Sequence, residues 1–298
     1  VDQTRGWFYT LHVIGTMVFD SVAYKNVVSN GLVLDKNGQK MSKRLGNATD
    51  PFETLATYGP DATRWYMISN ANPWDNLKFD LDGIDEVKRK FFGTLYNTYS
   101  FFTLYANIDQ FNNSEAPIPH KQRPEIDRWI LSELNSTIEK VDAYYASYEP
   151  TKAAREISDF TQERLSNWYV RLSRRRFWKG DYKKDKISAY QTLFRCMLTL
   201  SKLGAPIAPF FMDRLYLDLN TTSNLEPYAS VHLSEFPKAD SALIDKALEH
   251  KMSEAQLISS LVLSLRAKEK IKVRQPLRKI MIPVNSKLQK EAIQAVSD

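Results

Sequence analysis

The feature that most constrains the fold is a series of apolar stripes at helical spacing after residue 84, where the strand signal nearly disappears. Apolar residues recur every three or four positions in five segments: 126–145, 154–172, 187–200, the stretch after 205–211, and 243–265. Such spacing gives each helix one apolar face that must be buried against a neighbour. The sequence therefore predicts a helical bundle over residues 84–298 and a mainly α protein.

Residues 1–83 show a mixed pattern instead. The sequence predicts a helix over 8–19, a strand within 26–35, a turn at Asn37-Gly38, and short helices over 49–59 and 61–69. Asp50 and Asp61 are the expected N-caps of the two short helices, and Gly59 is the expected stop. We interpret residues 1–83 as the tail of an α/β domain.

The loop 37–47, NGQKMSKRLGN, gathers Lys40, Lys43 and Arg44 with no acidic residue among them. Lysines on a flexible hairpin can close over a phosphate chain after it has bound. The glycine-rich signatures GxxxxGK[ST] and GxGxxG are absent from the sequence, which counts against the P-loop and dinucleotide-binding classes. The loop therefore predicts phosphate chemistry of another kind.

A second concentration of positive charge lies within 164–186, with nine Lys or Arg against two Asp. Such a window can attract a polyanion, and its charge pattern fits both contact with RNA and a solvated helix face. Because successive helical residues turn by about 100°, Arg171, Arg174 and Arg175 fall on one side and Arg176 is turned away. The first three are the candidate RNA-binding residues, and the aromatic residues Trp168, Tyr169 and Trp178 are expected to pack beside them.

The pentapeptide 40–44, KMSKR, resembles the KMSKS signature of class I aminoacyl-tRNA synthetases. The stretches DQTRGWFYTLHVIGT, YKNVVSNGLVLDKNGQKMSKRLGN and LSNWYVRLSRRRFW, in this order, are similar to isoleucyl-tRNA synthetase. The resemblance covers nearly the whole chain. It implies that residues 1–83 are the C-terminal part of a Rossmann-like catalytic domain and that residues 84–298 are a helical anticodon-binding domain.

The resemblance also implies roles for individual residues. In the family, the second lysine of the signature contacts the ATP phosphates, so Lys43 and, in support, Lys40 are the expected catalytic residues. The whole pentapeptide, which also contains Met41, Ser42 and Arg44, is the expected ATP-binding segment, with Arg44 in place of the usual serine. Asp2, Gln3 and Trp7 resemble the family's aminoacyl-adenylate pocket.

The family needs a second signature, HIGH, which helps to hold ATP. The segment beginning at His12, HVIG, is rejected for this role because it lies in an apolar run at helical spacing and too close to the lysine loop. We therefore expect the chain to be the later part of a longer enzyme, inactive alone, without the first half of the nucleotide fold and without an editing domain.

The implied reaction is the ATP-dependent joining of isoleucine to tRNA(Ile), with ATP and Mg²⁺ entering as substrate. Two alternatives stay open: a valyl- or leucyl-tRNA synthetase, and a tRNA-binding module without chemistry of its own. Cys196, the one cysteine, permits no internal disulfide and no Cys-rich metal site, and we expect it to be a core thiol. No apolar run approaches the roughly 18 residues of a membrane helix, and no signal peptide opens the chain. The sequence thus predicts a cytoplasmic protein with no membrane contact and no metal site in this part.

Overall fold

The computed structural model describes residues 2–179 and 181–283. In the first part of the chain, β1 (Val33–Leu34) pairs in parallel with β2 (Leu77–Lys78), and among the described residues these two strands form the whole sheet. The strand predicted within 26–35 is therefore reduced to two residues, and β2 was not predicted. Its short sequence between Asn76 and Phe79 offers too few residues for an alternating pattern.

Three helices and two short 3-10 turns lie in the same part of the chain as this sheet. They are α1 (Trp7–Phe19), α2 (Pro51–Tyr58) and α3 (Pro60–Asn70), and the turns are η1 (Asp2–Thr4) and η2 (Lys43–Leu45). The predicted cap of α2 is confirmed, because the Asp50 side chain accepts hydrogen bonds from the amides of Phe52 and Glu53. Gly59 ends α2 as predicted, with φ of +85°.

The predicted N-cap role of Asp61 is wrong. Gly59 precedes α3, Pro60 fills its first position, and Asp61 lies inside the helix and is buried. Its carboxylate instead pairs with Arg64 and accepts a 2.6 Å hydrogen bond from the amide of Phe211. Asp61 therefore joins two distant helices, a role that no local pattern could indicate.

The second part of the chain is made of long helices, as the apolar stripes predicted. Two of them are continuous through a π-helical segment: α4 (Leu81–Val87) runs through η3 (Lys88–Phe92) into α5 (Gly93–Asp109), and α7 (Pro150–Asp159) runs through η5 (Phe160–Val170) into α8 (Arg171–Trp178). The others are α6 (Glu125–Ala146), α9 (Lys184–Gly204), α10 (Pro209–Ser223) and α11 (Lys246–Lys268). Short 3-10 turns connect them: η4 (His120–Gln122), η6 (Val231–Leu233) and η7 (Ser241–Leu243).

The core of the bundle lies between α6 and its neighbours. α6 packs against α7, η5 and α9, and α10 packs along α9. Trp129, Leu134, Ile157 and Leu193 are fully buried there, and so is Cys196, whose burial raises the pKa of its thiol to about 12. The predicted core thiol is thus confirmed. In the described part of the chain, no helix combines the length and hydropathy needed to cross a membrane.

α3 fastens the first part of the chain to the bundle. The Trp65 indole donates a 3.0 Å hydrogen bond to Ser158 Oγ and stacks on Phe91 at 4.1 Å. Thr151 Oγ1, at the start of α7, donates to the carbonyl of Ile68 at 2.7 Å. These contacts hold α3, which precedes β2 in the chain, against the helices of the bundle.

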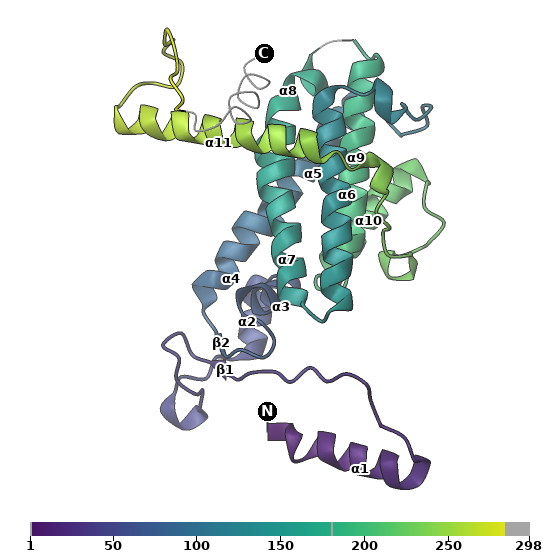
Figure 1. Ribbon diagram of the computed structural model, residues 1–298, viewed down its shortest axis with the longest axis vertical. Coiled ribbons are helices and arrows are strands. Elements are labelled where there is room, and N and C mark those ends of the chain that lie inside the picture. The colour runs from purple at the N-terminus through teal and green to yellow at the C-terminus, as the bar shows by residue number, and fades with distance from the viewer. Residues whose placement is uncertain (1, 180, 284–298) are drawn as a thin grey trace.

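The two ends of the described chain differ from this core. α1 lies apart at the lower end of Figure 1, and Gly15 is its only buried residue among those described. α11 crosses the bundle and extends beyond it, and Leu248 is its one buried residue among those described. The apolar stripe predicted for this helix does not include Leu248, and its residues Leu257, Leu261 and Leu265 are exposed, so the burial expected of that stripe is not found. Leu261, for example, is 55% exposed.

Candidate functional site

The lysine loop is a closed hairpin that follows β1. Leu34 and Lys40 form an antiparallel bridge, and the amide of Asp35 donates a 2.9 Å hydrogen bond to the carbonyl of Gln39. The reversal occurs at Gly38, whose φ of +84° is a conformation that residues with a side chain rarely adopt. The predicted Asn-Gly turn is therefore confirmed.

Lys43 begins the 3-10 turn η2, and both ends of this turn are capped. The Ser42 hydroxyl accepts a 3.2 Å hydrogen bond from the amide of Arg44, as an N-cap residue does. Gly46 ends the turn with φ of +65°, and its amide donates to the carbonyl of Lys43 at 3.3 Å. The backbone that carries Lys43 is thus locally ordered, although its side chain reaches into solvent.

Lys40, Lys43 and Arg44 are all exposed, and within the described residues their side chains form no ion pair. Met41 is different, because it is half-buried and lines an apolar cavity of about 390 Å³ with Val33, Leu55 and other residues of α2 and α3. The pentapeptide therefore presents three unpaired cations outward and anchors one apolar side chain inward. Such an arrangement can receive a polyphosphate.

Two residues that the sequence reasoning missed hold this loop together. Asp35 accepts hydrogen bonds from the amides of Asn37 and Gln39 at 2.9 and 2.8 Å. Asn47 donates to Asp35 Oδ2 at 2.9 Å and accepts from the amide of Ser42 at 2.8 Å. An Asx residue at each end of a cation-rich loop was the available signal, since Asp and Asn side chains commonly bond to nearby backbone.

The residues predicted for the adenylate pocket do not join the lysine loop. Asp2 and Gln3 lie in η1, and Trp7 begins α1 with 62% of its surface exposed. Gln3 Oε1 accepts a 3.4 Å hydrogen bond from the amide of Trp7. In the described part of the chain, no hydrogen bond connects these residues with 40–44. His12 is exposed on α1, with its ring 6.0 Å from that of Tyr24.

The predicted arrangement of the arginines on α8 is confirmed. Arg171, Arg174 and Arg175 are exposed, and none of them forms an ion pair with a described residue. Arg176 points into the bundle, where its guanidinium donates to both oxygens of Asp127 at 2.6 and 2.8 Å. α8 lies at the upper end of the bundle in Figure 1, and β1 with its loop lies at the lower end.

Asp127 is the centre of a buried polar cluster that holds α8. It is 0% exposed and also accepts hydrogen bonds from Tyr169 at 2.9 Å and Ser188 at 2.5 Å. Burial disfavours the charge of Arg176, but the hydrogen bonds from its guanidinium to Asp127 prevail and raise the pKa of Arg176. Burial, with the nearby Asp127 charge, raises the pKa of Tyr169 well above its ordinary value.

Fewer positive charges of the window 164–186 are free in the structure than the count from the sequence indicates. Several of its cations pair with carboxylates, most of which lie outside the window: Arg164 with Glu133, Glu156 and Asp159, Arg176 with Asp127 and with Asp185 of the window itself, and Lys186 with Asp109. The unpaired charge is therefore concentrated on the outer face of α8. Of the aromatic residues expected to pack there, Tyr169 is buried, Trp168 is half-buried, and Trp178 is 51% exposed.

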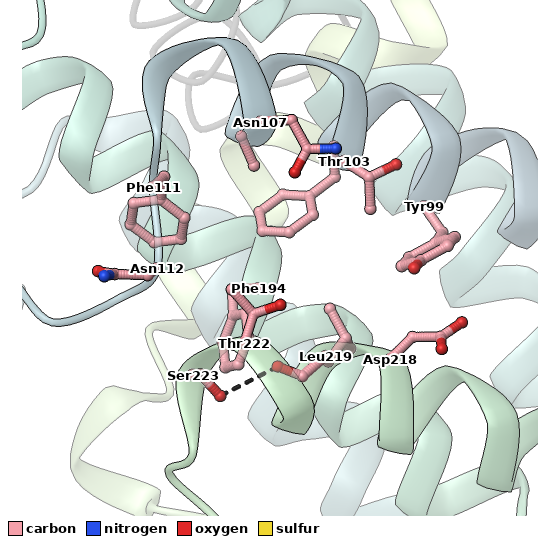
Figure 2. Close-up of a pocket in the computed structure, with 12 residues that line it drawn as sticks. Tyr99, Thr103, Asn107, Phe111, Asn112, Phe194, Asp218, Leu219, Thr222 and Ser223 are labelled. Atoms are coloured by element: carbon pink, nitrogen blue, oxygen red, sulfur yellow. Dashed lines mark hydrogen bonds between the residues drawn. The ribbon is translucent and has the colours of Figure 1, made fainter.

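A cavity of about 300 Å³ between α5, α9 and α10 contains none of the predicted residues (Figure 2). Phe102, Phe111 and Phe194 form its aromatic part, and Asp218 is the only charged residue among those that line it. A carboxylate repels phosphate groups. This cavity therefore does not belong to a phosphate site. Within the described residues, no group of three or more His, Cys, Asp or Glu could hold a metal ion.

Two family models match successive parts of the chain. Residues 1–80 match the family model for tRNA synthetases class I (I, L, M and V), and residues 127–281 match the model for the anticodon-binding domain of tRNA ligase. The second match alone covers more than half of the chain.

Curated relatives are similar over nearly all of the chain. It is 64% identical to the isoleucine–tRNA ligase of Bacteroides thetaiotaomicron over 99% of its length, and 63% identical to that of Cytophaga hutchinsonii over 100%. The ligase of Thermus thermophilus is 42% identical over 98% of the chain. The chain spans only 26%, 27% and 28% of the lengths of these three relatives.

A solved structure supports the fold. The LeuRS of Agrobacterium radiobacter K84, determined as a ternary complex with tRNA and LeuAMS, superposes with a TM-score of 0.59 at 20% identity. The match covers 80% of this chain and 27% of that one. The chain therefore belongs to the tRNA ligase family, with a class I tRNA synthetase segment followed by an anticodon-binding domain.

Proposed function

We propose that this chain forms the lysine-loop and anticodon-binding part of an isoleucine–tRNA ligase that works in the cytoplasm. Such an enzyme activates L-isoleucine with ATP to isoleucyl-adenylate and transfers the isoleucyl group to tRNA(Ile). The names of the relatives at 42–64% identity support the choice of isoleucine over valine or leucine. The observation that carries the proposal is the set of three unpaired cations on an ordered hairpin.

In the activation step, a carboxylate oxygen of isoleucine bonds to the α-phosphorus of ATP, and the bond from that phosphorus to the pyrophosphate oxygen breaks. Negative charge then grows on the departing pyrophosphate, which fixed cations stabilise more strongly than they stabilise bound ATP. We assign this role to Lys43, with Lys40 and Arg44 in support. Ser42 caps the turn that carries Lys43, and Met41 anchors the loop.

Mg²⁺ enters with ATP as part of the substrate and neutralises part of the negative charge of the phosphates. Asp2, Gln3 and Trp7 are proposed to line the aminoacyl-adenylate pocket together with residues of the longer protein. The exposure of Trp7 supports this role, because a large indole in solvent is available to a substrate side chain.

The RNA-binding face is proposed to be the outer side of α8, with Arg171, Arg174 and Arg175 contacting phosphates. Phosphate contacts position a protein on RNA without reading its sequence. A second basic segment, 266–279, contains seven Lys or Arg and one Glu and begins in the last turn of α11. This segment is the alternative location for the anticodon contacts.

The test is amino-acid-dependent exchange of labelled pyrophosphate into ATP by the full-length protein that carries this chain. We expect exchange with isoleucine and much weaker exchange with leucine, while valine supports a reduced rate because one methylene distinguishes it only modestly. The chain alone should show no exchange, since the lysine loop supplies only one part of an ATP site. Exchange that favours leucine or valine, or robust exchange by the chain alone, would contradict the proposal.

A further inference from the structure

The lysine loop is closed by one side-chain amide that makes three hydrogen bonds. Asn47 Oδ1 accepts from the amide of Ser42 at 2.8 Å, and Asn47 Nδ2 donates to Asp35 Oδ2 at 2.9 Å and to the carbonyl of Lys40 at 3.3 Å. Asn47 thus contacts the strand side of the loop and the residue that immediately precedes Lys43. Because the side chain donates two hydrogen bonds and accepts one, neither a carboxylate, which has no donor, nor a hydroxyl, which has a single donor, can replace it fully.

Asp35 completes the closure from the other side. One of its oxygens accepts from the amides of Asn37 and Gln39, and the other accepts from Asn47. The hydrogen bond from the Gln39 amide, followed by that from the Asn47 side chain, lowers the pKa of Asp35 below its ordinary value. The carboxylate therefore stays ionised and keeps its acceptors available near neutral pH.

These contacts bridge the part of the loop that backbone hydrogen bonds leave open. The antiparallel bridge ends at Lys40, and the turn η2 begins at Lys43. Between them, the Ser42 amide has Asn47 as its hydrogen-bond acceptor, and Met41 has the apolar cavity as its anchor. Without Asn47, the turn that carries Lys43 would be attached to β1 by flexible chain and by the Met41 side chain.

We propose that Asp35 and Asn47 form a latch that positions Lys43 for the ATP phosphates. The proposal rests on the proposed function, since it assigns a purpose to the conformation of the lysine loop. Neither residue is placed against the reacting atoms, so both act as positioning residues. The latch orders the loop before the transition state forms, and misplacement of a contact by about 1 Å can slow a reaction on the order of a hundredfold.

The variant that tests the latch is Asn47→Asp, which keeps the size of the side chain and its acceptor for Ser42. It removes the donor and places a second carboxylate against Asp35, so the latch should open. Asn37→Asp is the matched control, because it makes the same chemical change at an exposed position in the same hairpin. The Asn37 side chain makes no hydrogen bond within the described structure, where only its backbone amide is bonded.

Two readouts are measured in the full-length protein that carries this chain. Hydrogen exchange of peptides covering 35–47 should speed up in Asn47→Asp and stay near the parent rate in Asn37→Asp. Single-turnover formation of isoleucyl-adenylate at saturating ATP should fall about tenfold to a hundredfold in Asn47→Asp, while tRNA affinity stays unchanged. A general loss of folding would lower tRNA affinity as well, so this combination separates positioning from damage.

The exchanged pair, Asp35→Asn with Asn47→Asp, provides a rescue. The amide at position 35 can donate to the carboxylate at position 47, which still accepts from the Ser42 amide. We expect this double variant to form adenylate faster than either single variant, with exchange rates closer to the parent. Non-additivity of this sign is the signature of direct contact.

Failure of the latch and failure of the proposed function give different results. If Lys43→Ala forms adenylate as fast as the parent, the proposed function of the loop is wrong. If Lys43→Ala is slow but Asn47→Asp matches Asn37→Asp in rate, the latch proposal is overturned, whatever the exchange result. A slow Asn47→Asp with no rescue in the exchanged pair would also overturn the pairing with Asp35.

Discussion

The lysine loop and α8 both present exposed cations without ion-pair partners in the described chain, but the protein holds them in different ways. The loop 35–47 is secured by side-chain hydrogen bonds at the surface and by one anchored methionine. α8 is secured by Arg176 and the fully buried Asp127, whose partners lie on α8, η5 and α9. Surface hydrogen bonds exchange readily with water, whereas a buried ion pair is costly to break. We therefore expect the loop to open and close readily and the outer face of α8 to keep one conformation.

The largest expected effect is a loss of stability when the buried cluster that holds α8 is disrupted. Asp127→Ala removes the buried carboxylate that accepts hydrogen bonds from Arg176, Tyr169 and Ser188 and leaves Arg176 with only the exposed Asp185 as an ion-pair partner. The loss of this buried acceptor should reduce the free energy of unfolding by about 3–5 kcal/mol. Asp181→Ala removes the partner of Lys183 in an exposed pair and should change it by less than about 1 kcal/mol. Urea unfolding followed by circular dichroism measures both. Equal midpoints for the two variants would show that the buried pair does not hold α8.

The second effect concerns chemistry in the loop. Lys43→Ala should slow single-turnover adenylate formation in the full-length protein on the order of a hundredfold, because the variant lacks one preorganised cation that faces the developing charge. Lys36→Ala is the matched control, an exposed lysine in the same hairpin, and should be close to the parent. An unchanged rate for Lys43→Ala would make its loop a solvated surface.

A smaller effect is expected for RNA binding. Arg174→Glu with Arg175→Glu should weaken binding of tRNA(Ile) and flatten its dependence on salt, by about 0.7 to 0.9 in slope for each phosphate that the protein no longer neutralises. Arg89→Glu with Lys90→Glu changes two adjacent cations on η3 and serves as the control. Arg176→Ala is unsuitable as a control, since it acts through the Asp127 pair. Unaltered binding across a salt titration would show that the outer face of α8 does not contact the tRNA and would favour the segment 266–279 as the binding region.

The smallest effect is a pH dependence of the loop. Because the folded loop lowers the pKa of Asp35 below the ordinary 3.8, its hydrogen bonds are fully present above that value and are lost as pH falls through the lowered pKa. Nuclear magnetic resonance of the Asn47 side-chain amide should therefore show no change between neutral pH and about pH 5, and a transition only in strong acid. Asp35→Asn should abolish the transition. A midpoint above the ordinary value would contradict the assigned hydrogen bonds.

Local patterns predicted much of the fold and part of the candidate site. The apolar stripes located α6, α9 and α10, and the helical turn of about 100° per residue separated Arg176 from its neighbours. The helix over 81–109 was not predicted, because its aromatic residues also favour strands and its polar and apolar positions do not separate cleanly.

The remaining features depend on contacts between residues far apart in the sequence. Asp127 meets Arg176 across 49 positions, and Asp61 reaches the amide of Phe211 across 150. Charge counting within one window cannot detect such partners, so the sequence overstated the free charge near α8. Asp35 and Asn47 are only 12 positions apart, but their contact exists only once the hairpin has closed.

The most direct test of this account measures two quantities on two variants of the full-length protein. Single-turnover adenylate formation and tRNA(Ile) affinity are determined for Lys43→Ala and for Arg174→Glu with Arg175→Glu. We expect a double dissociation: the loop variant loses adenylate formation and keeps tRNA affinity, and the α8 variant loses tRNA affinity and keeps adenylate formation. If either variant impairs both quantities equally while remaining folded, the loop and α8 are not separate phosphate-binding surfaces, and the account is contradicted.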